Sequence, residues 1–182
     1  MIHSEYWESI NIAMKEIQKE KVDDACKLIV ERQSLGGELF ICGNGGSAST
    51  AEHATCDLSK GITLNTGRKF SAQCLTSNVS QLTAWSNDFG YSESLANILA
   101  IQACELDTLL VITGSGNSSN ILAVTEFAKS MGIPVIGLTG ADGGEISKKL
   151  DIEIRVQSQD MQIIENIHLS VIHLMYKIIS AS

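Results

Sequence analysis

Short, almost wholly apolar runs alternate along this chain with longer segments whose apolar residues recur every three or four positions. A strand buried on both faces has such a continuous run, whereas the longer spacing is typical of amphipathic helices. The runs predict strands over residues 38–42, 70–75, 108–113, 135–139 and 152–156. The longer spacing predicts two helices within residues 6–35 and further helices over residues 47–60, 78–87, 93–103, 121–131, 145–150 and 161–180. A polar loop is predicted over residues 61–68.

Strands that alternate with helices predict a doubly wound α/β domain, in which five parallel strands form a flavodoxin-like sheet with helices on both faces. We expect one domain over residues 1–182, with the sheet core at residues 36–158. The helices at residues 1–35 and 159–182 are additional to this core, and their long apolar faces predict packing against another subunit in a homo-oligomer. Ligands of such sheets bind beyond the carboxyl ends of the strands.

Two glycine-rich turns follow predicted strands. Residues 43–47 read GNGGS and residues 114–120 read GSGNSSN. Glycine allows a tight turn, and the free N–H groups and the dipole of the helix that follows favour an anion. The serines add neutral donors and acceptors, which suits a small phosphorylated molecule. A simpler explanation of the second turn is that Ser118 or Asn117 only caps the next helix.

Other features exclude several classes of function. The first turn is not a dinucleotide fingerprint, because position 48 is Ala48, and no G-K-[ST] follows it. A formal net charge of −8 without a basic run argues against a nucleic-acid surface. Five cysteines without a C-x-x-C pair indicate reduced, mostly buried thiols in a cytoplasmic protein. We find no signal-peptide pattern and no apolar run of membrane-spanning length.

Two predicted helices carry pairs of a histidine and a carboxylate. His53 and Asp57 lie four residues apart and share a helix face, and Glu165 and His173 lie eight apart on another. By the helical period, His168 faces elsewhere. Such pairs serve as a general acid and base or as ligands of a divalent metal, and a structural role for each histidine is equally open. The sequence does not by itself bring the two helices together.

A series of motifs, in this order, resembles the sugar isomerase (SIS) domains and, among them, the phosphoheptose isomerases. The motifs are GNGGSA at residues 43–48, NDFG at 87–90, GSGNS at 114–118, LTG at 138–140, DGG at 142–144 and E-x-x-H-x-x-x-x-H at 165–173. The resemblance covers essentially the whole chain. It implies the SIS fold, a cytoplasmic homotetramer with sites completed by neighbouring subunits, and zinc (Zn²⁺) as cofactor. It also implies conversion of sedoheptulose 7-phosphate to D-glycero-D-manno-heptose 7-phosphate for lipopolysaccharide or capsule.

The resemblance further implies roles for individual residues. Positions for substrate and phosphate binding match Asn44, Ser47, Asn78, Asn87, Asp88, Thr113, Ser115 and Ser118. His53 matches a metal ligand, and His173 matches the catalytic acid/base. The chain departs from the family at three places: Asp57 replaces a glutamate, Glu165 replaces a common glutamine, and Asn78 replaces an aspartate. Because two carboxylates neutralise a divalent cation, the expected zinc ligands are His53, Asp57, Glu165 and His173.

The expected reaction is an aldose–ketose isomerisation through an enediol. Asp57 is the expected base and His173 its acid/base partner, while the hydroxyl-rich turn holds the distant phosphate. One alternative is isomerisation of another phosphosugar. A second is a non-catalytic SIS module that binds a sugar phosphate or a protein such as DnaA. No nucleic-acid or membrane partner is expected.

Overall fold

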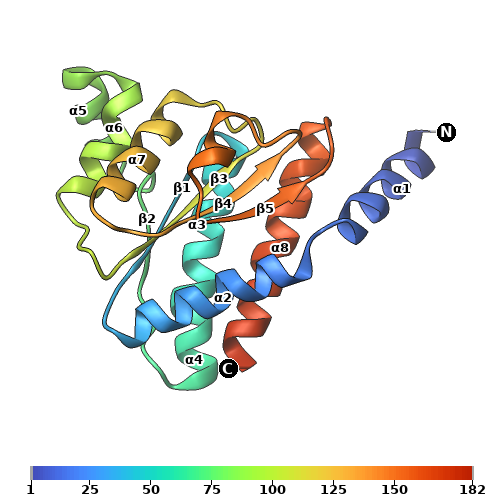
Figure 1. Cartoon of the computed structure of the whole chain (residues 1–182), viewed down its shortest axis with the longest axis horizontal. Helices are drawn as coiled ribbons and strands as arrows, with labels where there is room; N and C mark the ends of the chain where they lie inside the picture. Colours follow the sequence, from blue (N-terminus) through green and yellow to red (C-terminus); the bar gives the residue numbers. More distant parts are fainter. Residues whose placement is uncertain (1, 182) are drawn as a thin grey trace.

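The computed structural model describes residues 2–181 and has a five-stranded parallel sheet at its centre (Figure 1). The strands are β1 (Leu39–Gly43), β2 (Ala72–Cys74), β3 (Thr108–Thr113), β4 (Val135–Gly140) and β5 (Ile152–Val156). Their order is β2-β1-β3-β4-β5, and every neighbouring pair is parallel. Every residue of β1, β3 and β4 is buried, which explains their continuous apolar runs. The predicted doubly wound α/β fold is confirmed.

Helices cover both faces of the sheet and divide the core into two apolar clusters. One face packs against α1 (Ile2–Lys15), α2 (Lys19–Ser34), α3 (Gly46–Cys56), α4 (Ile62–Thr66) and α8 (Met161–Ala181). The other packs against α6 (Tyr91–Ala100), α7 (Ser119–Ser130) and the short 3₁₀ helix η2 (Glu145–Lys149). The remaining helix, α5 (Val79–Phe89), lies against α6 and buries none of its own residues. Because alternate strand residues point to opposite faces, Phe40 joins one cluster while Ile41 joins the other.

The prediction of a loop over residues 61–68 is wrong for the first part of that segment. After α3 the chain forms a π-helical turn, η1 (Asp57–Gly61), and then α4, so that the helical path runs unbroken from Gly46 to Thr66. Gly61 does not end the helix, because it is a close packing position: a Cβ there would lie 2.8 Å from the Tyr176 ring of α8. The helix ends at Gly67, which has the left-handed φ of 70° typical of a helix C-cap.

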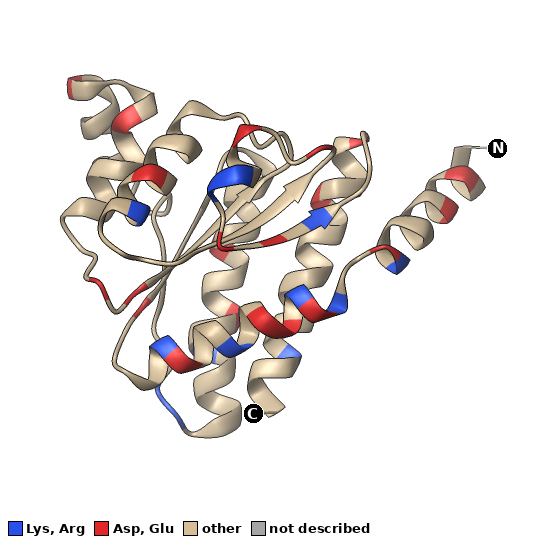
Figure 2. Ribbon diagram, viewed as in Figure 1, with Lys and Arg blue, Asp and Glu red and all other residues tan. Residues whose placement is uncertain are grey.

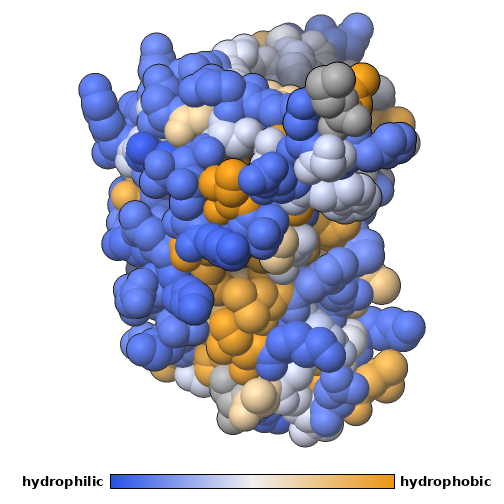
Figure 3. Space-filling model, turned by 90° about the vertical axis from the view of Figure 1, so that its right-hand side faces the viewer, coloured by the Kyte–Doolittle hydropathy of each residue, from blue (hydrophilic) through white to orange (hydrophobic). Residues whose placement is uncertain are grey.

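The terminal helices leave an apolar surface open. Helix α1 buries only Ala13, and Ile12, Met14 and Leu174 are exposed. An open groove between the end of α1 and α8 is lined by Met14, Ile17, Lys19, Ile167, Ser170, Val171 and Leu174. Figure 3, which views the molecule from the α1 side, shows hydrophobic residues gathered in a band on this face.

Charged residues of both signs are interspersed, most visibly along α2 (Figure 2). None of the helices within residues 2–181 combines the length and apolarity that crossing a membrane requires. Cys26, Cys42 and Cys74 are buried free thiols, whereas Cys56 and Cys104 are exposed. Burial raises the pKa of Cys26 to about 12 and also raises the pKa of Cys42 and of Cys74, so these three thiols stay protonated and unreactive.

Candidate active site

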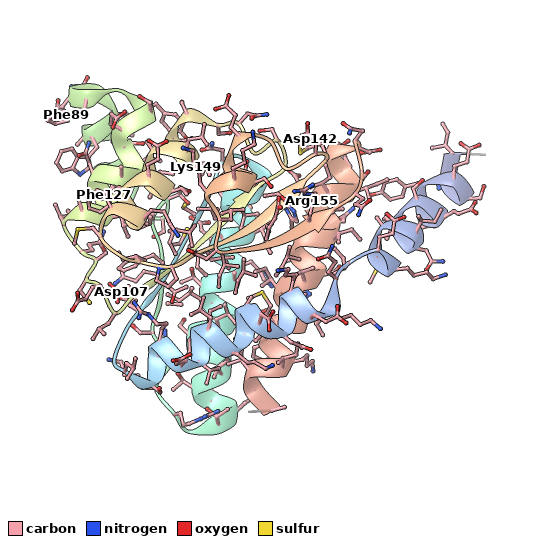
Figure 4. The ribbon with its side chains drawn as sticks, viewed as in Figure 1. Phe89, Asp107, Phe127, Asp142, Lys149 and Arg155 are labelled. Atoms are coloured by element: carbon pink, nitrogen blue, oxygen red, sulfur yellow. The ribbon has the colours of Figure 1, made fainter. Side chains whose placement is uncertain are left out.

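The two glycine-rich turns meet where the sheet changes its winding direction. Strands β1 and β3 are neighbours, but β1 leads into α3 on one face and β3 leads into α7 on the other. This divergence opens a crevice at the carboxyl edge of the sheet, the usual ligand position in such folds. In Figure 4, Asp107 lies before β3 at the amino edge and Asp142 lies after β4 at the carboxyl edge. The amino ends of α3 and α7 therefore both border the crevice, and each brings a positive helix end.

A pair of asparagines joins the two turns across the crevice. Asn44 follows β1 and Asn120 lies in the first turn of α7, and their side-chain amides exchange two hydrogen bonds. Asn44 Nδ2 donates to Asn120 Oδ1 at 2.9 Å, and Asn120 Nδ2 donates to Asn44 Oδ1 at 2.8 Å. The hydroxyl of Tyr91, at the start of α6, also donates to Asn44 Oδ1 at 2.7 Å. Asn44 is thus held by groups from two other elements.

The turn after β3 is built around its own hydroxyls. Gly116 N donates to Thr113 Oγ1 at 3.1 Å, and Asn117 N donates to Ser115 Oγ at 3.3 Å. Ser118 occupies the N-cap position of α7, yet its side chain makes no capping hydrogen bond. Asn117 directs its amide oxygen to Glu145 N at 2.9 Å and so does not cap α7 either. The simpler explanation, that Ser118 or Asn117 only caps the helix, therefore fails.

The DGG motif after β4 supports this turn from behind. Gly144 has a φ of 61°, and a Cβ on it would lie 2.4 Å from the carbonyl oxygen of Ser115. A Cβ on Gly116 would lie 1.9 Å from the carbonyl oxygen of Gly143. Only glycine allows two backbone turns to approach this closely. On its other side the loop lies against Arg155, which is labelled in Figure 4.

The turn after β1 leads into α3 through Gly45, whose φ of 55° and ψ of −122° are reserved for glycine. Gly43 is also required: a Cβ there would lie 2.7 Å from Ser47, which is buried in the first turn of α3. Helix α3 therefore begins directly over the end of β1. The predicted binding residues Asn44, Ser47, Thr113, Ser115 and Ser118 all lie in or beside the two turns that border the crevice.

Farther along α3, three predicted residues come together. His53 and Asp57 of the α3–η1 segment meet His173 of α8, and the nearest atoms are the Nε2 of each histidine and Asp57 Oδ2. The two nitrogens are 3.0 Å apart, and Asp57 Oδ2 lies 3.2 Å from His53 and 3.7 Å from His173. The side chains of His53, Asp57 and His173 are 48%, 34% and 50% exposed. This cluster is accessible to a ligand.

The donor set of this cluster fits a zinc ion. Tetrahedral zinc with bonds of 2.0–2.1 Å places its ligand atoms about 3.3 Å apart. The three observed separations lie on both sides of that value. Two histidines and one carboxylate leave a fourth position open, as in catalytic zinc sites. The contact between the two Nε2 atoms needs a hydrogen on one of them, and a metal bound there would displace that hydrogen from Nε2.

Glu165 lies outside this three-residue group. Its carboxylate sits against Gly46 at the amino end of α3, where a Cβ on Gly46 would come within 2.5 Å of Oε2. His53 is seven residues farther along α3, which corresponds to about 10 Å of helix. As the fourth ligand that the sequence predicts, Glu165 would have to bridge that separation.

His168 lies inside the core and not in the site, as its helical phase predicts. It is fully buried, and its Nε2 lies 3.0 Å from the carbonyl oxygen of Thr139. Burial lowers the pKa of His168 to about 4, so the ring is neutral. A carbonyl oxygen only accepts, so Nε2 carries the hydrogen and the buried Nδ1 is left without a partner.

Three further predicted substrate residues lie at the ends of α5. Asn78 accepts a hydrogen bond from Gln81 N at 3.1 Å and caps this helix, and Asn87 donates to Asp88 Oδ1 at 2.9 Å near its other end. All three are exposed. Figure 4 shows the next residue, Phe89, at the outer end of α5. Within the described chain these residues are not joined to the cluster at His53.

Sequence reasoning did not single out Tyr91 or Asn120. Tyr91 directly follows the NDFG motif, whose Gly90 has a φ of 88° and separates α5 from α6. Asn120 ends the run GSGNSSN and is buried, although asparagine is seldom buried without a partner. The places of Tyr91 after NDFG and of Asn120 at the end of GSGNSSN are visible in the sequence. The burial of Asn120 and the common partner Asn44, distant along the chain from both, are not.

The chain is similar to proteins of known family. A model of the SIS domain matches residues 5–140. A phosphoheptose isomerase of Colwellia psychrerythraea is 36% identical over 187 aligned positions, which cover 100% of this chain and 94% of that protein. One of Alteromonas mediterranea is 37% identical and covers 94% of this chain and 89% of the relative. A solved phosphoheptose isomerase from Francisella tularensis has a TM-score of 0.92 at 34% identity, covering 100% of this chain and 97% of its own.

Proposed function

Because the chain belongs to the SIS domain family, and within it to the phosphoheptose isomerases, we propose that it interconverts sedoheptulose 7-phosphate and D-glycero-D-manno-heptose 7-phosphate. The reaction moves a carbonyl group between two neighbouring carbons of a phosphorylated sugar. It needs an anchor for the phosphate and, some distance away, an acid and a base.

One observation supports this proposal above all: the cluster of His53, Asp57 and His173 shares helix α3 with the start of the phosphate-binding crevice. The amino end of α3 lies beside Asn44, and His53 follows about 10 Å along the helix axis. A phosphate held by the turn at Ser115 and Ser118 would leave the sugar chain free to extend along α3. A module that only binds sugar phosphates would have no need for the cluster.

The chain's own residues have separate tasks in this reaction. The Asp57 carboxylate takes the proton from the carbon beside the carbonyl group, and the electron pair of that C–H bond forms the enediol. His173 gives a proton to the carbonyl oxygen and later takes one back from the neighbouring hydroxyl, and Asp57 returns its proton to the former carbonyl carbon, which restores the base. Ser47, Thr113, Ser115 and Ser118 hold the phosphate, so that remote binding energy orients the reacting carbons.

Zinc is the proposed cofactor, and His53, Asp57 and His173 would hold it. Asp57 and His173 would transfer protons only after leaving the metal when the substrate arrives. Glu165, the fourth ligand expected from the sequence, lies outside this group. When bound, a divalent cation polarises a carbonyl oxygen and stabilises negative charge that develops on it. The carboxylates offset the charge of the cation.

We also propose a cytoplasmic homotetramer, in which the helices at residues 1–35 and 159–182 pack between subunits around the core at residues 36–158. The apolar groove between α1 and α8 supports this assembly. Substrate residues at Asn78, Asn87 and Asp88 would then serve a site shared between subunits, and a neighbouring subunit would exclude water from the half-exposed cluster. The product would supply the heptose of lipopolysaccharide or capsule.

The decisive experiment measures turnover of sedoheptulose 7-phosphate by the purified protein with and without added zinc. Asp57→Asn should lower turnover about 10²–10⁴-fold, the usual contribution of a general base. Glu52→Gln, an exposed carboxylate on the same helix, serves as the matched control. Tight binding of sugar phosphates without turnover of any of them would instead favour a non-catalytic module. Turnover of a different phosphosugar alone would correct the substrate.

A further inference from the structure

The side-chain amide of Asn44 is held by more partners than a surface asparagine needs. Its Oδ1 accepts from Tyr91 Oη at 2.7 Å and from Asn120 Nδ2 at 2.8 Å. Its Nδ2 donates to Asn120 Oδ1 at 2.9 Å. Asn120 is buried, whereas Asn44 is only half-buried and borders the crevice.

The Asn44 amide has one hydrogen-bonding group that its protein partners do not use. An amide oxygen has two lone pairs, and both are used by Tyr91 and Asn120. An amide nitrogen has two hydrogens, and Asn120 uses one of them. One N–H remains. In this arrangement Asn44 can therefore donate to a ligand but cannot accept from one.

Tyr91 adds a third hydrogen bond to this pair. The two asparagines alone would pair equally well if both amides were turned over, because each amide has one donating and one accepting side. In the structure the Tyr91 hydroxyl donates to the oxygen of Asn44, which leaves an N–H of Asn44 at the crevice. In the turned-over pair the hydroxyl would accept from the Asn44 nitrogen, its own hydrogen would lose this acceptor, and an oxygen of Asn44 would face the crevice.

We propose that Tyr91 and Asn120 are positioning residues that hold Asn44 so that its free N–H points at an oxygen of the substrate. The inference rests on the proposed function, because the substrate is taken to be a sugar phosphate. Two kinds of substrate oxygen accept such a bond: the carbonyl oxygen, which gains negative charge as the enediol forms, and an oxygen of the phosphate or a hydroxyl, which does not. In both cases the substrate oxygen that faces Asn44 accepts a hydrogen bond from it.

The first test compares Tyr91→Phe with Tyr6→Phe. Tyr6 provides a matched control, because its hydroxyl also bonds an asparagine side chain, that of Asn166 at 2.6 Å, but outside the crevice. We expect Tyr91→Phe to lower kcat/KM for sedoheptulose 7-phosphate about tenfold, the effect of losing one oriented hydrogen bond, and Tyr6→Phe to change it less than about twofold. A fall in kcat identifies the carbonyl oxygen as the acceptor, and a rise in KM identifies an oxygen whose charge does not change during the reaction. Equal activity of the two variants would overturn the inference.

The second test exchanges Asn44 itself. Asn44→Asp keeps two of the three hydrogen bonds, those from Tyr91 and from Asn120 Nδ2, and loses the bond to Asn120 Oδ1. It also replaces the free donor with an acceptor that repels substrate oxygens. Asn44→Ala removes every hydrogen bond. If Asn44 directs a donor at the substrate, the aspartate variant is the less active of the two; if Asn44 only holds the turns together, the alanine variant is. The second outcome contradicts the inference.

These outcomes separate the inference from the proposed function. An inactive wild-type protein would overturn the function, and the same variants would then be compared by their affinity for sedoheptulose 7-phosphate in a calorimetric titration. Weaker binding by Tyr91→Phe than by Tyr6→Phe supports the positioning role. Unchanged affinity, or no binding by the wild type, overturns it.

Discussion

The carboxylate of Glu165 lies against the backbone of Gly46, so close that a Cβ on Gly46 would come within 2.5 Å of Oε2. The contact joins α8 to the amino end of α3, where a negative charge is stabilised by the helix dipole. Farther along the same two helices, His173 meets His53 and Asp57. Glu165 and His173 thus face α3 at two different positions along its axis, Glu165 at its amino end and His173 farther along.

This separation predicts that three residues suffice to hold the metal. Glu165→Gln should retain the zinc content of the wild type within about a factor of two, whereas His173→Ala should lose most of it, because a site with two remaining ligands binds zinc poorly. Metal analysis of the two variants, purified without chelator, measures their zinc content. Loss of zinc from Glu165→Gln would show instead that the glutamate turns toward the cluster and completes the set of four.

A second prediction concerns Gly144, which packs against the turn proposed to bind the phosphate. Gly144→Ala should raise the KM for the sugar phosphate at least about tenfold, because the new methyl group would displace the turn at Ser115, and small displacements of a binding group are costly. Gly132→Ala is the matched control: Gly132 also has a positive φ, of 73°, but nothing lies within 4 Å of its Cβ position. Gly132→Ala adds a backbone strain of about 1–2 kcal/mol. Gly144→Ala adds more, because a φ of 61° with a ψ of −162° is essentially confined to glycine. A similar KM in both would mean that the DGG loop does not support the turn.

The free hydroxyl of Ser118 gives a third prediction. Because this side chain makes no capping bond, Ser118→Ala should leave the unfolding midpoint almost unchanged while raising the KM about 10-fold or more, the effect of one hydrogen bond to a charged group. Ser119→Ala, at the adjacent exposed position, controls for a change of serine in the same turn. A clear loss of stability with an unaltered KM would restore the explanation of Ser118 as a helix cap.

The buried His168 predicts a dependence of stability on pH. Its pKa is about 4 in the folded protein but close to its ordinary value of 6.5 in the unfolded chain, so between these values the unfolded chain binds the additional proton. Stability that is complete above pH 6.5 should therefore fall as the pH drops toward 4, by on the order of 3 kcal/mol.

Urea unfolding between pH 7.5 and pH 4.5 measures this effect. His168→Gln should show a weaker dependence than the wild type, since a glutamine amide can replace the Nε2–H bond to Thr139 without binding a proton. His3→Gln, at an exposed position of α1, should follow the wild type. Identical curves for His168→Gln and the wild type would exclude this histidine as the source.

The sheet and most helices could be predicted because local signals agree with the tertiary structure. Strand β3 has six buried residues and appears in the sequence as an apolar run with the same bounds. The segment at Ile62 to Thr66 was missed because Gly61 resembles a helix end, and only its contact with Tyr176, more than a hundred residues away, shows that it is a packing position.

Within the candidate site, the limits of sequence reasoning have a similar cause. His53 and Asp57 share a helix face, and the helical period predicts their proximity. The partner His173 and the bridge from Asn44 to Asn120 depend on how β1 and β3 lie side by side and on how α8 crosses the sheet. Spacing along the chain does not contain this information.

The seven-residue step from Gly46 to His53 has a consequence for the choice of substrate. If the glycine loops hold the phosphate as proposed, their close packing fixes the distance from that anchor to the proposed reacting groups on α3. A phosphorylated triose or tetrose held at the turn would then end before it reached the histidines, whereas a longer sugar would extend to them. The helix would thereby discriminate by the number of carbons, before any hydroxyl group is recognised.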